Sequence, residues 1–242
     1  MAEFKLPTEI VELPSKGLIY PEDNPLSSGK VEMKYMTAKE EDILSNQAYI
    51  EKGIVIDKLL QSLIVSDINY NDLIIGDKNA IMVAARILGY GKNYSFTYDG
   101  EEIEVDLTTL ENKSLNEKLF TKGINNFSYT LPATDTEITF KILTHKDEQN
   151  IGREIEGLKK ISKTDSSTVS TRLKHIITSV GGDAEQKTVR EFVDKYMLAQ
   201  DSRALRNHIQ TFQPDIDLTF FPPNGEDRRT LPIGLNFFWP DI

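Results

Sequence analysis

The chain has 242 residues, a formal net charge of −10, a pI near 4.9 and no cysteine. This acidity argues against nucleic-acid binding, because neutralising phosphates needs a basic surface, and the missing cysteines exclude disulfides, thiolate nucleophiles and cysteine-ligated zinc. No apolar run approaches the roughly 20 residues that span a bilayer and no secretion signal opens the chain, so we expect a protein without membrane contact that stays in the cytoplasm in which it is made.

Residues 1–36 predict an extended arm followed by a first strand. Four prolines among the first 29 residues favour extended backbone with short strands at most. Extended arms often lie across a partner subunit, so Leu18 and Tyr20 are candidate partner-binding residues. Packing of the arm on its own domain is an alternative of at least equal weight. From Val31 to Tyr35 apolar and charged residues alternate, as in a half-buried strand.

A capping box predicts where the first helix begins. Thr37 stands three residues before Glu40, the spacing at which each residue can satisfy the backbone amide of the other. We interpret the acidic residues at 40–42 as stabilisers of the helix start, where the helix dipole favours negative charge, and not as site residues. The helical period continues to Val65, and Gly53 is expected to divide it into two helices.

The next helix completes an N-terminal helical part, residues 37–92. Asp77 is expected to be its N-cap, and the helical pattern extends to about Leu88. Gly89 then follows in the position that glycine prefers just after a helix.

Between residues 93 and 144 the apolar period changes to two, which predicts a β-rich insert. The dipeptide Asp99-Gly100 suits a type I′ turn between two alternating runs. Ser114 and Glu117 have capping-box spacing and predict a short helix before Gly123. We therefore expect a small antiparallel sheet between two helical parts.

Residues 145–242 predict a C-terminal helical part that ends in a β-hairpin. A polar loop at 162–168 precedes a helix through Ile177, which is expected to end at Gly181-Gly182. A Thr188 and Glu191 capping box and an Asp201 cap predict the next two helices. Two strand-like runs, 218–221 and 231–239, are joined by a charged tip. The predicted fold class is α+β, a mainly helical core with an inserted small antiparallel β subdomain and the C-terminal hairpin.

The sequence predicts neither metal nor cofactor binding and assigns no catalytic residue. His145, His175 and His208 lie in different segments, and one His145 and Glu148 pair falls short of the three or four ligands that a metal site needs. The glycines at 89–91 and 181–182 do not fit a phosphate-binding loop, and no GxSxG elbow occurs. With 38 acidic residues, pairs of carboxylates do not discriminate. We expect a protein that is not an enzyme; the enzymatic alternative is a carboxylate-dependent cell-wall hydrolase.

Four short segments stand in a fixed order along the chain: Leu13–Pro21 (LPSKGLIYP), Met36–Asp42 (MTAKEED), Ile75–Ala80 (IGDKNA) and Arg86–Gly91 (RILGYG). This ordered set resembles the baseplate hub and hub-assembly proteins of T-even-type contractile-tailed phages. It covers roughly residues 10 to 92, and Phe237–Pro240 resembles the ending of some relatives. The resemblance implies a hub subunit or an assembly factor, located in the host cytoplasm during assembly or in the virion tail baseplate.

The chain departs from that family just after Gly91. Many members carry a Cys-x-x-Cys pair there, in what looks like a zinc ribbon. This chain has the alternating run 94–105 around Asp99-Gly100 instead. We interpret it as a zinc-free version of the same insert, because the two-residue turn can form without metal.

The aromatic terminus is the first candidate for partner binding, since aromatic residues dominate interface hot spots. Strand alternation would place Phe237 and Trp239 on one face and Phe238 on the other, and burial of all three in the chain's own sheet is the favoured alternative. The partners that the resemblance implies are other baseplate hub or tape-measure proteins, with no nucleic acid, membrane or small-molecule substrate. A generic cytoplasmic adaptor or chaperone is the alternative function.

Overall fold

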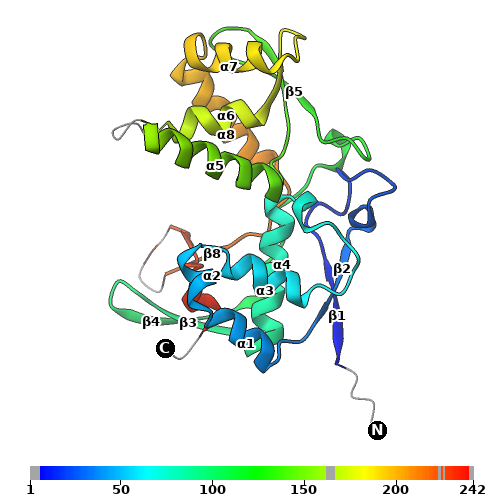
Figure 1. Ribbon diagram of the computed structural model, residues 1–242, viewed down its shortest axis with the longest axis vertical. Helices are drawn as coiled ribbons and strands as arrows, with labels where there is room; N and C mark the ends of the chain where they lie inside the picture. Colours follow the sequence, from blue (N-terminus) through cyan, green and yellow to red (C-terminus); the bar gives the residue numbers. More distant parts are fainter. Residues whose placement is uncertain (1–5, 162–166, 223–224, 226, 240–242) are drawn as a thin grey trace.

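The computed structural model describes residues 6–161, 167–222, 225 and 227–239, and they form an α+β fold (Figure 1). The predicted fold class is therefore confirmed. The α-helices of the described part are α1 (Ala38–Leu44), α2 (Gln47–Glu51), α3 (Val55–Leu63), α4 (Ile75–Tyr90), α5 (His145–Ile161), α6 (Thr168–Ile176), α7 (Gln186–Lys195) and α8 (Ala199–Phe212).

The strands form small antiparallel sheets. Short 3-10 turns lie in the connections, among them η2 (Tyr70–Asp72) between α3 and α4, and η4 (Glu117–Leu119). A further one, η5 (Leu235–Phe238), lies near the end of the described chain. The pairings are β1 (Thr8–Glu12) with β2 (Lys30–Lys34), β3 (Asn93–Tyr98) with β4 (Glu101–Asp106), β6 (Glu137–Phe140) with both β5 (Phe127–Thr130) and β7 (Ile177–Val180), and β8 (Thr219–Phe220) with β9 (Arg229–Thr230).

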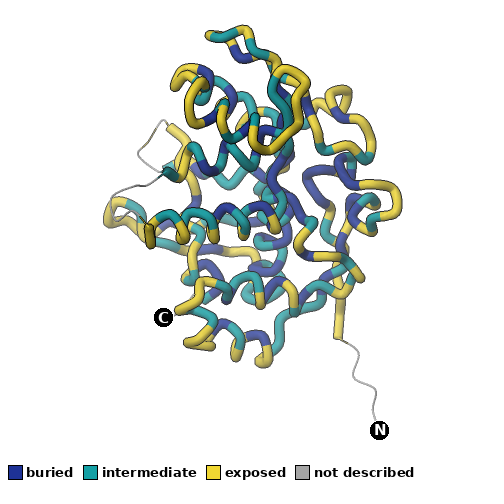
Figure 2. The backbone as a smooth tube through the Cα atoms, turned by 45° about the horizontal axis from the view of Figure 1, so that its top comes forward, coloured by how far each residue is buried: buried dark blue, intermediate teal, exposed yellow. Residues whose placement is uncertain are grey.

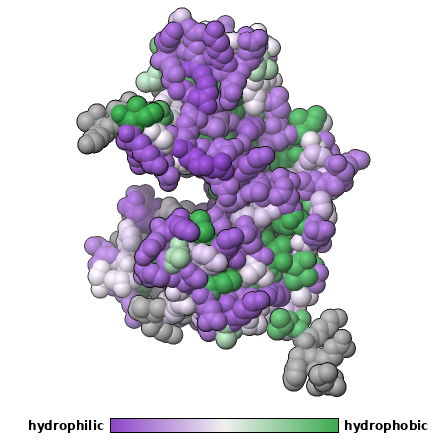
Figure 3. Space-filling model, viewed as in Figure 1, coloured by the Kyte–Doolittle hydropathy of each residue, from purple (hydrophilic) through white to green (hydrophobic). Residues whose placement is uncertain are grey.

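The elements gather into two lobes (Figure 1). The lower lobe of that view holds α1–α4, β1–β4 and the β8–β9 hairpin, and the upper lobe holds α5–α8 with β5. The chain thus leaves the lower lobe after β4 and returns to it after α8. Buried stretches run through the middle of the molecule (Figure 2), and the face in Figure 3 is mostly hydrophilic and hollowed between the lobes.

The predicted β-rich insert is split between the two lobes. The β3–β4 hairpin forms as expected, with Asp99 and Gly100 at φ 50° and 83° in its turn. The second pair, β5–β6, gains a third strand from residues 177–180, which were predicted to continue a helix. The helical prediction was wrong there because α6 ends at Ile176, and Ile177 and the residues after it pair with β6 instead.

Helix α4 differs from the prediction at both ends. It begins at Ile75, so Asp77 lies inside the first turn and is not the N-cap. It also continues through Gly89 to Tyr90, and Gly91 follows it with a φ of 83°. The apolar pattern located the helix correctly, but the cap residues were misassigned.

Other predicted caps have mixed outcomes. The box of Thr37 and Glu40 is confirmed. The box at Thr188 was wrong, because α7 begins at Gln186 and the Thr188 hydroxyl donates to Asp183. Only the 3-10 turn η4 forms after Ser114, and Asp201 lies within the first turn of α8. The polar loop at 162–168 and the charged tip of the last hairpin fall partly outside the described residues.

Asp77 fastens the N-terminal arm to the start of α4. Its fully buried carboxylate accepts hydrogen bonds from the Ser15 amide at 2.9 Å, the Ser15 hydroxyl at 2.7 Å and the Tyr20 hydroxyl at 2.6 Å. The Tyr20 hydroxyl in turn accepts a bond from the Ile74 amide at 3.1 Å. Burial raises the pKa of both Asp77 and Tyr20, so the network is held in a water-poor site.

The first turn of α4 is also the junction of the lobes. The His145 amide donates to the Leu73 carbonyl at 2.7 Å, which joins the start of α5 to the residues before α4. Gly76 lies against the segment that follows α8: a Cβ at this position would stand 1.9 Å from the Pro214 carbonyl oxygen. Only glycine allows this approach of helix and loop.

We expect Gly76→Ala to lower the free energy of unfolding by about 1 to 3 kcal/mol, because the added methyl group forces the backbone at Pro214 to move. Gly157→Ala is the matched control, since a Cβ there meets nothing within 4 Å, and it should raise stability by about 0.5 to 1 kcal/mol. Urea unfolding measures both. Equal effects of the two substitutions would contradict the close approach.

Asp77→Ala should lower the free energy of unfolding by about 3 kcal/mol, because the Ser15 and Tyr20 donors lose their acceptor in a buried site. Asp42→Ala, at an exposed position in α1, should change it by less than about 0.5 kcal/mol. Chemical unfolding compares the two variants. A loss at Asp77 as small as that at Asp42 would show that the network does not hold the arm.

Candidate partner-binding groove

The β3–β4 hairpin packs one face on aromatic residues from the C-terminal end of the chain. Ring centroids lie 4.9 Å apart for Tyr94 and Phe237, 5.0 Å for Phe96 and Phe220, and 5.5 Å for Tyr98 and Phe220. These edge-to-face contacts join segments more than 100 residues apart in the sequence. The last part of the chain therefore returns to complete the core of the lower lobe.

The run 231–239 is not the strand that was predicted. Residues Leu235–Phe238 form the 3-10 turn η5, and Phe237 and Phe238 are both fully buried. In a strand these neighbours would point to opposite faces, whereas the turn directs both into the core. Trp239 remains half-buried at the surface. Of the predicted aromatic set, only Trp239 is placed where a partner can touch it.

The fold also gives the two predicted arm residues different surroundings. Tyr20 is 4% exposed and its hydroxyl donates to Asp77, while Leu18 is half-buried. The arm packs on its own domain between β1 and β2, as in the alternative left open by the sequence. Leu18 and Trp239 thus remain the surface candidates of the set, and Tyr20 has a structural role.

A groove of about 690 Å³ lies between β3 and the chain around η5. Its size falls within the range of about 300 to 1,000 Å³ that is usual for ligand sites. The Tyr94 hydroxyl donates to the Pro232 carbonyl at 2.6 Å and ties the two walls together. The lining residues are Tyr94, Ser95, Phe96, Thr97, Pro232, Ile233, Gly234, Leu235, Asn236 and Trp239.

The wall formed by β3 is an unpaired strand edge. The Leu107 amide donates to the Lys92 carbonyl at 2.8 Å, which fixes which residues of the hairpin are hydrogen-bonded pairs. Every second residue pairs, so the amides and carbonyls of Ser95 and Thr97 point away from β4. The Asn93 carbonyl has the same direction and accepts a bond from Arg86 at 2.9 Å. Within the described chain, no backbone group pairs with Ser95 or Thr97.

Acidic side chains lie on β4, one strand in from this edge. Glu104 and Glu102 are the cross-strand partners of Ser95 and Thr97, and all four are exposed on the face of the hairpin opposite the aromatic one. The hairpin beside the groove therefore has an aromatic face and an acidic face. Sequence reasoning missed Ser95 and Thr97, although the alternation that it used already placed them on the polar face.

A polar cluster at the junction of the lobes has the residue types of a catalytic site. Asp57 accepts bonds from Lys78 at 2.5 Å and from the Tyr70 hydroxyl at 3.0 Å. His145 lies 3.7 Å from the same carboxylate, and Gln149 contacts its Nε2 at 3.0 Å. Except for the exposed Gln149 these side chains are buried or half-buried, and they bind one another. The cluster therefore joins α3 and α4 to α5, and we assign it no reaction.

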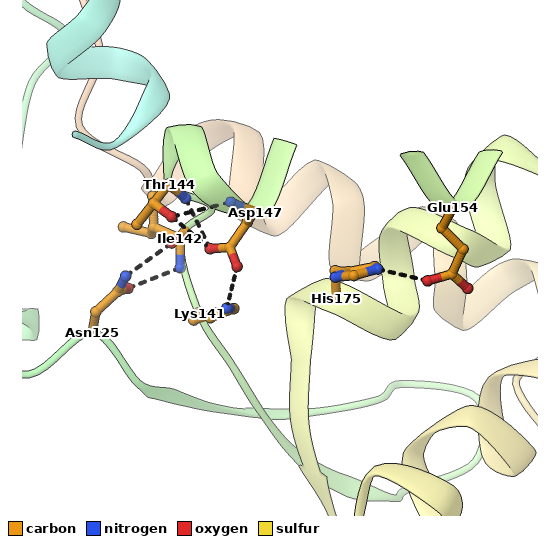
Figure 4. Close-up of polar contacts among 7 residues, drawn as sticks. All are labelled: Asn125, Lys141, Ile142, Thr144, Asp147, Glu154 and His175. Carbon is orange, nitrogen blue, oxygen red and sulfur yellow. Dashed lines mark hydrogen bonds and ion pairs between the residues drawn. The ribbon is translucent and has the colours of Figure 1, made fainter. Parts of the chain in front are cut away.

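The remaining polar clusters of the upper lobe also link elements (Figure 4). Asp147 caps the first turn of α5 by accepting from Thr144 and Lys141, at 2.7 to 3.0 Å. Glu154 accepts from His175 at 2.9 Å, and hydrogen bonds from Arg190 lower the pKa of Glu154 to about 2. Across the described ranges, no group of three or more His, Cys, Asp or Glu residues could hold a metal ion.

Comparisons with protein-family models, curated proteins and solved structures find no match to this chain. Among the described helices, none combines the length and the apolar character needed to cross a membrane.

We expect stability to fall below about pH 6.5, because burial lowers the pKa of His145 beneath its unfolded value. Lys78 also lowers it, while Asp57 and Glu148 oppose the shift. The neutral ring stabilises the fold at pH 7, and this stability is lost as the pH falls, by at most about 1.4 kcal/mol per pH unit for one histidine.

The test measures urea unfolding at pH 7.0 and 5.5. His145→Gln should show a weaker pH dependence than the unaltered chain. His208→Gln is the comparison variant, because burial also lowers the pKa of His208. It should keep the part of the pH dependence that comes from His145. If His145→Gln leaves the slope unchanged, the ring is not a source of the pH dependence.

Proposed function

We propose that this protein is a non-enzymatic baseplate hub protein of a contractile-tailed phage, which acts through protein-protein contacts as a hub subunit or as an assembly factor. The observation that carries the proposal is the meeting of the motifs that resemble that family. Ser15 and Tyr20 of the opening segment bind Asp77 of the third segment. Motifs far apart in the sequence thus act together in one part of the fold.

The other two motifs also have defined places around α4. Glu40 caps α1 and accepts a bond from Lys34 of β2 at 2.9 Å. Arg86 donates to the Gly91 carbonyl at 2.9 Å and fixes the exit from α4. Proteins that share a fold are expected to keep residues that bind one another in this way. The contacts therefore support a resemblance in fold. Function is argued separately, from the site.

The groove supports a binding role. Its β3 wall offers unpaired backbone groups, and its aromatic side offers Trp239 beside buried rings. An extended segment of another protein can use both, whereas a reaction would need a positioned nucleophile or base. A partner protein in the tail, such as another hub protein or the tape-measure protein, fits this arrangement.

Deletion of the gene from the phage that encodes it should leave infected cells without complete, contractile tails and lower the yield of infectious particles by several orders of magnitude. Electron microscopy of lysates and plaque titres measure the two effects, and a plasmid copy should restore both. Normal tails and titre after deletion would rule out an essential hub role and favour a generic adaptor or chaperone.

Mass spectrometry of purified virions separates the two forms of the proposal. Stoichiometric recovery beside other baseplate proteins identifies a hub subunit. Absence from finished particles, combined with the tail defect, identifies an assembly factor.

A further inference from the structure

We propose that the groove beside β3 binds an extended basic segment of a partner protein, which adds to the β3–β4 hairpin as a third strand. This inference rests on the proposed function, in that it names the kind of partner segment that the protein holds. The segment alternates basic and apolar residues over about five positions.

The backbone of β3 determines that the occupant is a strand. Ser95 and Thr97 each present an amide and a carbonyl to the groove, on alternate residues of one strand. This spacing matches the spacing of donors and acceptors along an added strand. Exposed edges of this kind invite pairing with another chain, and two-stranded sheets gain stability from a third strand.

The opposite wall leaves room for the added strand. It runs through Pro232, which has no amide to donate, and through Gly234, whose backbone is extended and where a Cβ would meet nothing within 4 Å. The wall is held in place by the Tyr94 bond to Pro232 and by the burial of Phe237 and Phe238. A preformed slot of this kind does not have to be ordered when the segment binds.

The two faces of the hairpin determine the side-chain pattern of the segment. Side chains of an added strand alternate between the faces of the sheet. On one face they meet the ring of Phe96 and the neighbouring Trp239, which favour apolar groups. On the other face they lie beside Ser95 and Thr97, and the carboxylates of Glu102 and Glu104 stand one strand further on, where the long side chains of lysine or arginine extend toward them. The net charge of −10 adds to this preference for a basic segment.

Synthetic peptides test the inference directly, with the full chain as the binding protein. The probes are Lys-Val-Lys-Val-Lys-Val, its acidic counterpart Glu-Val-Glu-Val-Glu-Val, and the rearranged Lys-Lys-Lys-Val-Val-Val. Trp239 is the only tryptophan in the chain, so its fluorescence reports events at the groove. We expect saturable binding of the alternating basic peptide, at least tenfold tighter than the other two, and weaker binding at high salt.

Thr97→Pro and Thr97→Val form the matched pair of variants. The amide of Thr97 points away from β4, so proline leaves the hairpin ladder intact but removes a donor and blocks the edge. Valine keeps the amide and removes only the hydroxyl. The proline variant should bind the alternating basic peptide at least tenfold more weakly, and the valine variant within about twofold of the unaltered chain.

Circular dichroism and thermal unfolding establish that both variants fold. If Thr97→Pro does not fold, Glu102→Lys with Glu104→Lys replaces it and should reverse the preference between the basic and acidic peptides. Equal affinity of the three peptides, or unchanged binding by folded Thr97→Pro, would overturn the inference.

The phage experiment separates this inference from the proposed function. Complementation of the gene deletion with Thr97→Pro should fail, whereas Thr97→Val should restore tails. Full rescue by Thr97→Pro would refute the groove inference and leave the hub role standing. Normal tails after deletion alone would refute the hub role, and peptide binding would still decide the groove.

Discussion

The buried carboxylate of Asp77 is the constraint on which the rest of the lower lobe depends. A carboxylate removed from water must be satisfied by donors, and here the donors come from Ser15 and Tyr20, about 60 residues earlier in the chain. The N-terminal arm therefore has one docking position. The same turn of α4 also lies against Pro214, and Leu73, just before this turn, accepts a bond from the His145 amide. The docked arm and the junction between the lobes therefore share one turn of helix.

Buried aspartates also lie in the first turns of other helices. Asp201 is fully buried in the first turn of α8 and accepts bonds from the Ala133 amide at 2.7 Å and the Thr134 hydroxyl at 2.9 Å. Asp147 at the start of α5 binds Lys141 and the residue before the helix. The helix dipole stabilises a negative charge at each of these positions. The donors to Asp147 are local, whereas those to Asp77 and Asp201 come from distant segments and make a tertiary contact. Asp77 and Asp201, which the sequence predicted as helix caps, thus join distant parts of the fold.

The groove arises from the way in which the lower lobe is completed. The end of the chain covers the aromatic face of the β3–β4 hairpin and uses Phe220 and Phe237 to do so. Within the described residues, which end at Trp239, this part of the chain does not pair with β3, so the outer edge of that strand lies unpaired beside Trp239. A protein that closes its core while leaving an edge unpaired has a place for a strand from another chain, which agrees with a role in holding partners during assembly.

The sequence by itself determined the α+β class, the location of most helices and the β3–β4 hairpin, because periodicity and turn residues act over a few neighbours. It also identified the capping box of Thr37 and Glu40. Only the tertiary structure decided that Asp77 and Asp201 bind distant loops, that residues 177–180 pair as β7, and that Phe237 and Phe238 are both buried. It alone brought the edge of β3 and Trp239 into one groove. These outcomes depend on contacts between segments far apart in the chain, which no local pattern encodes.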